Sequence, residues 1–149
     1  MHITPREADR RLAALARRQH GCVTTAQLLA AGLHRNAIAT RMRRGLLKRL
    51  HYGVYLIGAP NTQTPYLAAV LACGPAALLS HRAAAVVWRI VNTRPGAIDV
   101  TVTQGHRRSR PGIKVHQSPA ERTARHGIPI TTPQRTLEDL KKILGADAY

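Results

Sequence analysis

The sequence lacks acidic residues over most of its first two thirds. No aspartate or glutamate occurs between Asp9 and Asp99, whereas that window holds thirteen arginines and lysines. The formal net charge of the whole 149-residue chain is +16. A field of one sign attracts phosphate and repels cationic partners. Nucleic acid is therefore the first partner class to consider, and an anionic membrane surface the second.

Aromatic residues and cysteines are scarce. The chain has no phenylalanine, one tryptophan and four tyrosines, so we expect an aliphatic core and little stacking of bases on aromatic side chains. Its two cysteines, Cys22 and Cys73, stand far apart, and neither has a second ligand at zinc spacing. This pattern predicts buried thiols and no metal or other cofactor.

Long apolar segments are absent too. The longest run, Tyr66 to Cys73, is far shorter than a bilayer span, and no amino-terminal stretch combines a basic region with an apolar signal core. We therefore expect a cytoplasmic protein without membrane contact. Hydrophobic residues make up 44 % of the chain, enough to bury a core, which excludes a disordered basic tail.

Capping signals divide the first part of the chain into helices. Thr4 to Glu7 and Thr24 to Gln27 each have the spacing of a capping box, and Gly21 and Gly32 can end the helices that follow. After a short turn, a third and basic helix is predicted from Ala37 to Arg44. The sequence therefore predicts three consecutive helices.

A hairpin is predicted next. Leu46 to His51 alternates like a strand, Tyr52-Gly53 suits a tight turn, and Val54 to Ile57 is β-branched and aromatic. Helix, short helix, turn, basic helix and hairpin is the order of a winged helix-turn-helix. We place this domain at residues 1–59, where a linker-like stretch follows.

The remaining residues, 60–149, predict a small domain of helices and an antiparallel sheet, so that the whole chain is α+β. Ala97 to Thr103 is the clearest strand, and Gly112 to His116 alternates like its partner across a basic loop. Helices are expected to begin at Thr64, Ser80 and Thr132.

The third helix carries donors suited to the major groove of DNA. Its inward face would be Ile38 and Met42, which leaves Arg35, Asn36, Thr40, Arg43 and Arg44 toward solvent. Arginine can hold guanine, and asparagine adenine, through two hydrogen bonds, while arginine and threonine also bind phosphate. The alternative is a solvated helix face without a partner.

Two other basic segments could contact the DNA backbone. The first is the predicted wing, at Lys48, Arg49, His51 and Tyr52. The second is the loop between the predicted strands, at Arg107, Arg108 and Arg110. A plain exposed hairpin and a merely solvated loop are the respective alternatives.

Catalysis is not indicated. The histidines show neither ligand spacing nor a carboxylate partner in the sequence. Metal-dependent nuclease chemistry needs clustered carboxylates, but the chain has seven acids, and the adjacent Glu138 and Asp139 would point about 100° apart on a helix. We therefore expect that the protein is not an enzyme.

Several separated motifs carry a resemblance to a known family. In the first half they are Gly21 to Leu28, Gly32-Leu33 before an arginine-rich helix, and Gly53-Val54-Tyr55. In the second half they are Leu71 to Pro75, Leu79 to Ala84, Trp88, Gly127 to Pro133 and Arg135-Thr136-Leu137. The first set resembles the amino-terminal winged-helix domain of the AbiEi family of antitoxins, and the second set is similar to the region that follows it in actinobacterial members.

The resemblance implies a transcriptional repressor that binds inverted repeats in its own promoter and opposes a nucleotidyltransferase toxin, often in phage defence. By position it implies a DNA-reading set of Thr25, Gln27, Arg35, Asn36, Thr40, Arg41, Arg43 and Arg44, with the wing at Lys48 to Tyr52. Two copies on an inverted repeat are the expected mode. The alternatives are the DNA-targeting portion of a longer Vsr-like endonuclease and a sequence-blind nucleic-acid-binding protein.

Overall fold

The computed structural model describes residues 4–93, 96–105 and 110–147 and has the predicted α+β class. The chain divides into two compact units, Met1–Ala68 and Ala69–Tyr149. This division falls inside helix α4 (Thr64–Cys73), after the linker-like stretch at which the sequence suggested a boundary. Among the described residues, no helix is both long and apolar enough to cross a membrane.

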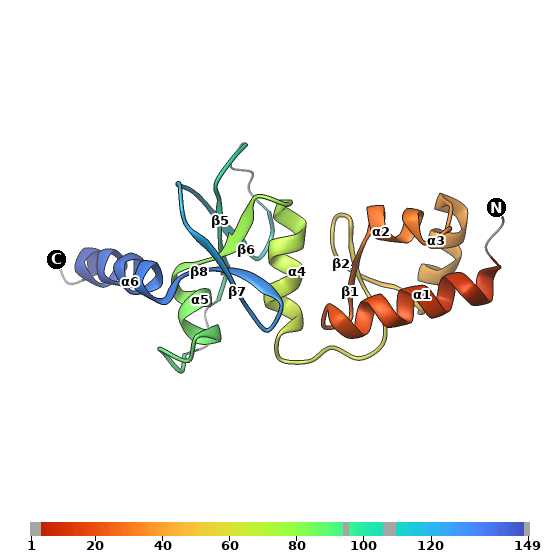
Figure 1. Ribbon diagram of the computed structural model, residues 1–149, viewed down its shortest axis with the longest axis horizontal. Coiled ribbons are helices and arrows are strands. Elements are labelled where there is room, and N and C mark those ends of the chain that lie inside the picture. Colours follow the sequence, from red (N-terminus) through yellow and green to blue (C-terminus); the bar gives the residue numbers. More distant parts are fainter. Residues whose placement is uncertain (1–3, 94–95, 106–109, 148–149) are drawn as a thin grey trace. The chain divides into compact units, whose positions relative to one another are not determined.

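The first unit contains three helices and a three-stranded sheet (Figure 1). In chain order the elements are α1 (Pro5–Arg18), β1 (Cys22–Thr24), α2 (Thr25–Ala30), α3 (Arg35–Arg43), β2 (Lys48–His51) and β3 (Val54–Leu56). Strand β3 lies between β1 and β2 and pairs antiparallel with both. The order of helices followed by a hairpin is that of a winged helix-turn-helix. The short strand β1 was not predicted.

Both predicted capping boxes form. Thr4 Oγ1 accepts the N–H of Glu7, and Thr24 Oγ1 accepts the N–H of Gln27. The side chains of Glu7 and Gln27 in turn accept the backbone N–H of the two threonines. These reciprocal bonds satisfy amide groups that would otherwise lack partners at a helix start, which fixes where α1 and α2 begin.

Helix α3 begins earlier than predicted. The sequence placed Arg35 and Asn36 in a turn, but His34 occupies the N-cap position and its Nδ1 accepts the N–H of Ala37 at 3.3 Å. Histidine is not among the preferred N-cap residues, so the usual signal was missing. Arg35 and Asn36 therefore belong to the first turn of α3.

One aliphatic cluster holds the first unit together. Its buried members are Ala8, Leu12, Ala16, Val23, Leu28, Ala31, Leu33, Ile38, Leu47 and Tyr55. Helix α1 supplies a row at intervals of four residues, as expected for a helix with one inward face. Helix α3 supplies a single buried residue, Ile38, so its orientation depends on few apolar contacts.

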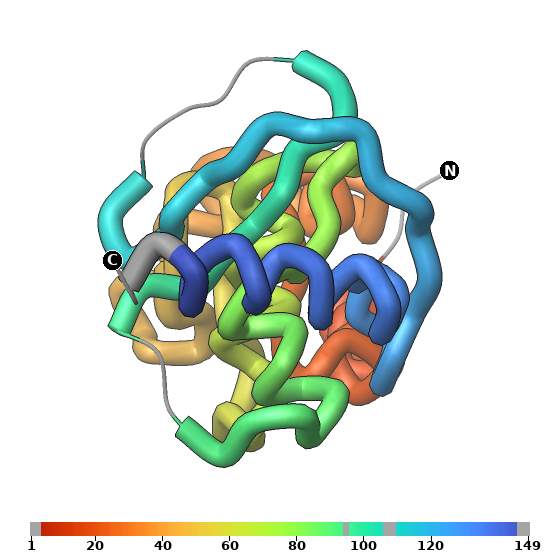
Figure 2. Tube along the Cα trace, turned by 90° about the vertical axis from the view of Figure 1, so that its left-hand side faces the viewer, coloured from red at the N-terminus to blue at the C-terminus, as the bar shows by residue number. Residues whose placement is uncertain are grey.

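The second unit is built on a five-stranded sheet with the order β6-β5-β4-β8-β7. Besides the end of α4, its elements are β4 (Ala77–Leu79), α5 (His81–Val87), β5 (Ile98–Val102), β6 (Ile113–Gln117), β7 (Arg122–Arg125), β8 (Ile128–Thr131) and α6 (Pro133–Asp147). Helices α5 and α6 pack side by side, as Figure 2 shows.

The prediction of an antiparallel sheet in this unit was wrong, because the sheet is mixed. Strands β5 and β6 are parallel, as are β4 and β8, whereas β4 pairs antiparallel with β5 and β7 with β8. A hairpin loop usually has about two to five residues. Ten residues separate β5 from β6 in the sequence, and Ile113 at the start of β6 pairs with Ile98 at the start of β5.

Replacing Gly21 should cost more stability than replacing Gly58. Both have positive φ, +84° and +78°, but a Cβ at Gly21 would lie 2.6 Å from Leu56 Cδ1, whereas one at Gly58 would meet nothing within 4 Å. Gly58→Ala should therefore cost only the left-handed backbone penalty, about 1–2 kcal/mol. Gly21→Ala should lower the free energy of unfolding by more than this, because Leu56 must also shift. Urea unfolding measures both free energies, and equal losses would contradict this packing.

Candidate nucleic-acid interface

Helix α3 and the residue after it present four exposed polar side chains: Arg35, Asn36, Arg43 and Arg44. Thr40, which is half-buried, braces this surface. Its hydroxyl donates to the backbone oxygen of Asn36 at 2.9 Å and accepts from Nη2 of Arg43 at 3.1 Å. The Arg43 guanidinium is thereby held against the helix, so it would lose less conformational freedom on binding a ligand.

The first turn of α3 favours negatively charged ligands. It contains no acidic residue, and the unpaired N–H groups at the start of a helix carry a partial positive charge. Arg35 adds a full charge there, and Asn36 adds an amide with both a donor and an acceptor. The start of α3 can therefore offer directional hydrogen bonds as well as charge.

Two members of the predicted DNA-reading set are engaged within the unit. Arg41 forms an ion pair with Asp9 at 3.0 Å, and only 17 % of its side chain is exposed. The amide oxygen of Gln27 accepts from the backbone of Thr24 and from Gln19 Nε2, and its Nε2 donates to Gln19 Oε1. In this structure both side chains connect helices of the unit.

The wing is attached to the start of α2. The N–H of Thr25 donates to the backbone oxygen of Gly53, in the turn between β2 and β3, at 3.0 Å. The pairing register shifts between Arg49 and His51, an irregularity that changes the twist of an edge strand. Tyr52 is 80 % exposed at the turn, and the Arg49 guanidinium lies 5.4 Å from its ring centroid.

The wing residues differ in exposure. Lys48 and Arg49 are exposed, like Tyr52, whereas His51 is half-buried. The structure thus brings together the exposed end of the wing and the start of α2 through the Thr25 contact. These side chains can supply positive charge and one aromatic ring, and Arg49 can also hold guanine through two hydrogen bonds.

Most of the predicted basic loop of the second unit lies outside the described residues. Arg107 and Arg108 lie outside the described residues. Arg110 is half-buried beside Cys73, where burial raises the pKa of the thiol and the Arg110 charge and hydrogen bond oppose that rise. Arg110 therefore has a partner within its own unit.

The second unit contains a cluster of titratable side chains that the sequence did not reveal. The rings of His81 and His116 stack with centroids 3.8 Å apart. His116 Nε2 lies 2.9 Å from Asp99 Oδ1, and His81 Nδ1 lies 3.9 Å from Asp139 Oδ2. Strands β5 and β6 and helices α5 and α6 bring these residues together from distant positions, so their spacing in the sequence gave no signal.

This cluster ties α5 to its neighbours. Ser80 stands at the N-cap position but makes no capping bond; its hydroxyl instead contacts His81 Nδ1 and accepts from Thr101, both at 2.8 Å. Ser80 is fully buried, so it is closed to a substrate. Within residues 4–93, 96–105 and 110–147, no three His, Cys, Asp or Glu side chains are placed to hold a metal ion.

The adjacent acids of α6 do not share a site. Glu138 is exposed, whereas the side chain of Asp139 is 4 % exposed and accepts from Arg135 Nε at 3.0 Å. Their separation follows from the helix geometry predicted from the sequence.

Comparison with known proteins finds a family match within the first unit. Residues 10–58 match the family model described as "Transcriptional regulator, AbiEi antitoxin", a segment that covers most of α1 through β3. The resemblance predicted from the first half of the sequence is therefore confirmed over residues 10–58, which include α3 and the wing, and the match does not extend to the motifs of the second half. No curated protein matches the chain.

The fold is also similar to a solved structure, that of the RV2827C protein from Mycobacterium tuberculosis. The TM-score is 0.55 at 20 % sequence identity, and the match covers 94 % of this chain and 61 % of that chain. The present chain thus spans about three fifths of that protein's length. At this identity the likeness concerns the fold alone.

His81 should make the stability of the second unit depend on pH. Burial and the charge of the neighbouring His116 lower the pKa of His81 below its ordinary 6.5, an effect that Arg135 reinforces and that Asp139 and Asp99 oppose. The unfolded chain therefore binds this proton at higher pH than the folded chain does. The contribution of neutral His81 to the free energy of unfolding should be fully present above about pH 6.5. It should be lost as the pH drops through the lowered pKa.

His81→Asn tests this dependence, because asparagine tolerates the φ of 53° at this position. Thermal unfolding of the wild type should weaken more steeply between about pH 7 and about pH 5 than that of His81→Asn. His126→Asn is the matched control, since His126 is exposed and has a φ of 54°. Parallel pH profiles for the wild type and His81→Asn would contradict the role of His81.

Proposed function

We propose that this chain, whose amino-terminal segment is of the AbiEi regulator type, is a sequence-specific DNA-binding transcriptional repressor. One observation carries the proposal: α3 exposes Arg35, Asn36, Arg43 and Arg44 around a braced Thr40. A helix fits the major groove of B-DNA, where each base pair presents a distinct pattern of donors and acceptors. The family match over residues 10–58 supports the regulatory role.

The two ends of α3 would have different roles. Asn36, in the first turn, can pair with the N6 and N7 atoms of adenine, whereas Arg43 and Arg44 can bind guanine or phosphate. A helix of nine residues is roughly 13 Å long, which corresponds to about four base pairs of duplex. One copy would therefore read a short half-site.

The wing would position the helix rather than read sequence. Lys48 and Arg49 can neutralise phosphates, and Tyr52 can pack on the sugar-phosphate backbone from the tip of the turn. Thr25 would contribute from the start of α2 beside this turn. Arg41 and Gln27 would hold the helices of this surface in place, because their polar groups already have partners in the unit.

A short half-site favours two copies on an inverted repeat. When two half-sites lie on one duplex and the two copies are linked, the first bound copy raises the effective concentration of the second at its half-site. The overall affinity then increases without new contacts. We propose that such a repeat lies in the protein's own promoter and that the protein acts on it in the cytoplasm as a regulator and not as an enzyme.

The family type extends the proposal to a partner. We propose that this chain, like antitoxins of the AbiEi type, opposes a nucleotidyltransferase toxin and takes part in phage defence, with repression as the means and no direct contact required. A nucleotidyltransferase encoded beside this chain and expressed from their shared native promoter should arrest growth, and co-expression of the chain should restore growth. Growth arrest that persists would limit the proposal to transcriptional regulation.

Asn36→Ala should remove sequence preference at one base pair of each half-site. Duplexes selected from a random pool by the wild-type protein should contain an inverted repeat. Against these, Asn36→Ala should lose about 1–3 kcal/mol of discrimination at one position, or roughly 5- to 150-fold, because the two bonds to the base are gone. Competition binding with single-base variants measures this loss.

Gln134→Ala is a matched control, since Gln134 is likewise an exposed amide in the first turn of a helix, α6 in the second unit. It should leave both preference and affinity unchanged. If the wild type selects no sequence, or if Asn36→Ala weakens selected and random duplexes equally, α3 does not read bases and the proposal of a sequence-specific repressor is wrong.

A further inference from the structure

Helix α1 carries a second basic surface. Five of its arginines are exposed: Arg6, Arg10, Arg11, Arg17 and Arg18. We call this surface the α1 arginine face. Across the described part of the chain, none of the five is in an ion pair, in contrast to Arg41. None of them belongs to the α3 surface or to the wing.

The arginines form two pairs around a small residue. With about 100° per residue, Arg10 and Arg17 fall on one row of the helix, and Arg11 and Arg18 fall on the next. Ala14 is exposed between these rows and half-way along them. The two pairs are seven residues apart, roughly 10 Å along the axis. A phosphate backbone can therefore approach the helix at Ala14 with guanidinium groups on either side.

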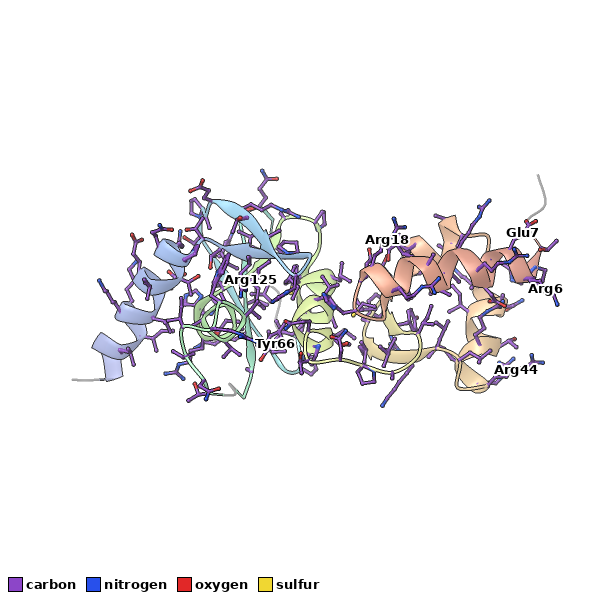
Figure 3. All side chains as sticks on the ribbon, turned by 60° about the horizontal axis from the view of Figure 1, so that its bottom comes forward. Arg6, Glu7, Arg18, Arg44, Tyr66 and Arg125 are labelled. Carbon is purple, nitrogen blue, oxygen red and sulfur yellow. The ribbon has the colours of Figure 1, made fainter. Side chains whose placement is uncertain are left out.

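The Arg18 side of this face points away from α3. Asp9 contacts α3 through its ion pair with Arg41, so the Asp9 side of α1 is turned toward α3. Arg18 is nine residues further along, or about two and a half turns, which places it on the opposite side of the helix. Figure 3 shows the same relation, with Arg18 and Arg44 on opposite sides of the first unit. A duplex bound at α3 would leave Arg18 free.

The composition of the face favours nucleic acid over a protein partner. Protein interfaces depend on buried aromatic or large apolar side chains at their centre. Between the arginine pairs, α1 exposes only Ala13 and Ala14. Unpaired arginines without apolar anchors match a ligand of regularly repeated negative charge, which is the DNA backbone.

We propose that the α1 arginine face binds the backbone of a second DNA segment, independently of sequence, while α3 holds the first. The inference rests on the proposed function, since α3 supplies the primary contact. The protein would then bridge two duplexes, or two distant parts of one bent duplex. Each arginine pair would neutralise phosphates on one side of Ala14, and the salt dependence of capture would report those contacts.

A sandwich assay with the full chain tests the proposal. An immobilised duplex retains the protein, and a labelled second duplex is then added and its capture per retained chain is measured. Arg10→Gln/Arg11→Gln/Arg18→Gln should keep the protein on the first duplex but reduce capture of the second by about tenfold or more. Glutamine and arginine have similar helix propensities, so α1 should remain folded, as circular dichroism can verify.

The matched control removes three exposed lysines from the second unit, in Lys114→Gln/Lys141→Gln/Lys142→Gln. It has the same loss of charge and should capture the second duplex as well as the wild type does. Equal losses in the two triple variants would mean that net charge alone is responsible, which would overturn the proposal. Unchanged capture by the α1 variant would also overturn it, because pairs of chains would then form the bridge through their α3 helices.

Two other results separate this inference from the proposed function. If the first duplex retains the wild type but no second duplex is captured, the α1 inference is wrong and the proposed function stands. If the first duplex does not retain the wild type, both are wrong. Capture of labelled polyglutamate in place of the second duplex would assign the α1 arginine face to an acidic protein and overturn the inference.

Discussion

The packing of Ile38 is the contact on which the candidate interface depends. It is the one buried residue of α3, and it meets a core supplied by α1, α2 and the sheet. The half-buried Ala37 and Met42 pack against the same core. The Asp9–Arg41 ion pair adds a polar contact between α1 and α3, although a pair with one exposed partner is worth only about 0–1 kcal/mol in stability. The direction in which Asn36 and Arg43 point follows from these contacts together.

The structure shows where the positive charges of the acid-free stretch between Asp9 and Asp99 lie. In the sequence, the positive charges from Arg10 onward have no acid among them. In the structure, Asp9 pairs with Arg41, and the exposed arginines of the helices in the first unit lie in two groups, one on α1 and one on or directly after α3. Charge that looks uniform along the chain is therefore separated into two surfaces of one small unit. The hydrophobic stripe of α1 causes this separation, since it fixes which side of the helix faces the core.

Local patterns predicted the first unit well, because its boundaries depend on neighbouring residues. The capping boxes at Thr4 and Thr24 and the hairpin turn at Tyr52-Gly53 need only short-range bonds. Strand β1 was not predicted, because three residues are too few to show an alternation of apolar and polar side chains. It is a strand because it pairs with β3. The His34 cap was missed because histidine rarely acts in this way.

Long-range contacts set the limits of prediction in the second unit. The parallel pairing of β5 with β6 depends on the path of a connection, and alternation alone is the same for parallel and antiparallel neighbours. The contacts among His81, His116, Asp99 and Asp139 likewise arise only when the sheet and α6 assemble. The set of candidate contact residues was predictable from helical periodicity, whereas the engagement of Arg41 and Gln27 required the packed unit.

Amide chemical shifts of the isotope-labelled chain, followed during titration with one selected duplex per chain, test the central claim most directly. The account predicts that the largest changes occur from Arg35 to Arg44 and from Lys48 to Gly53. The second unit should change little. Shifts concentrated in the second unit, with α3 unperturbed, would contradict the assignment of α3 and the wing as the DNA-binding surface.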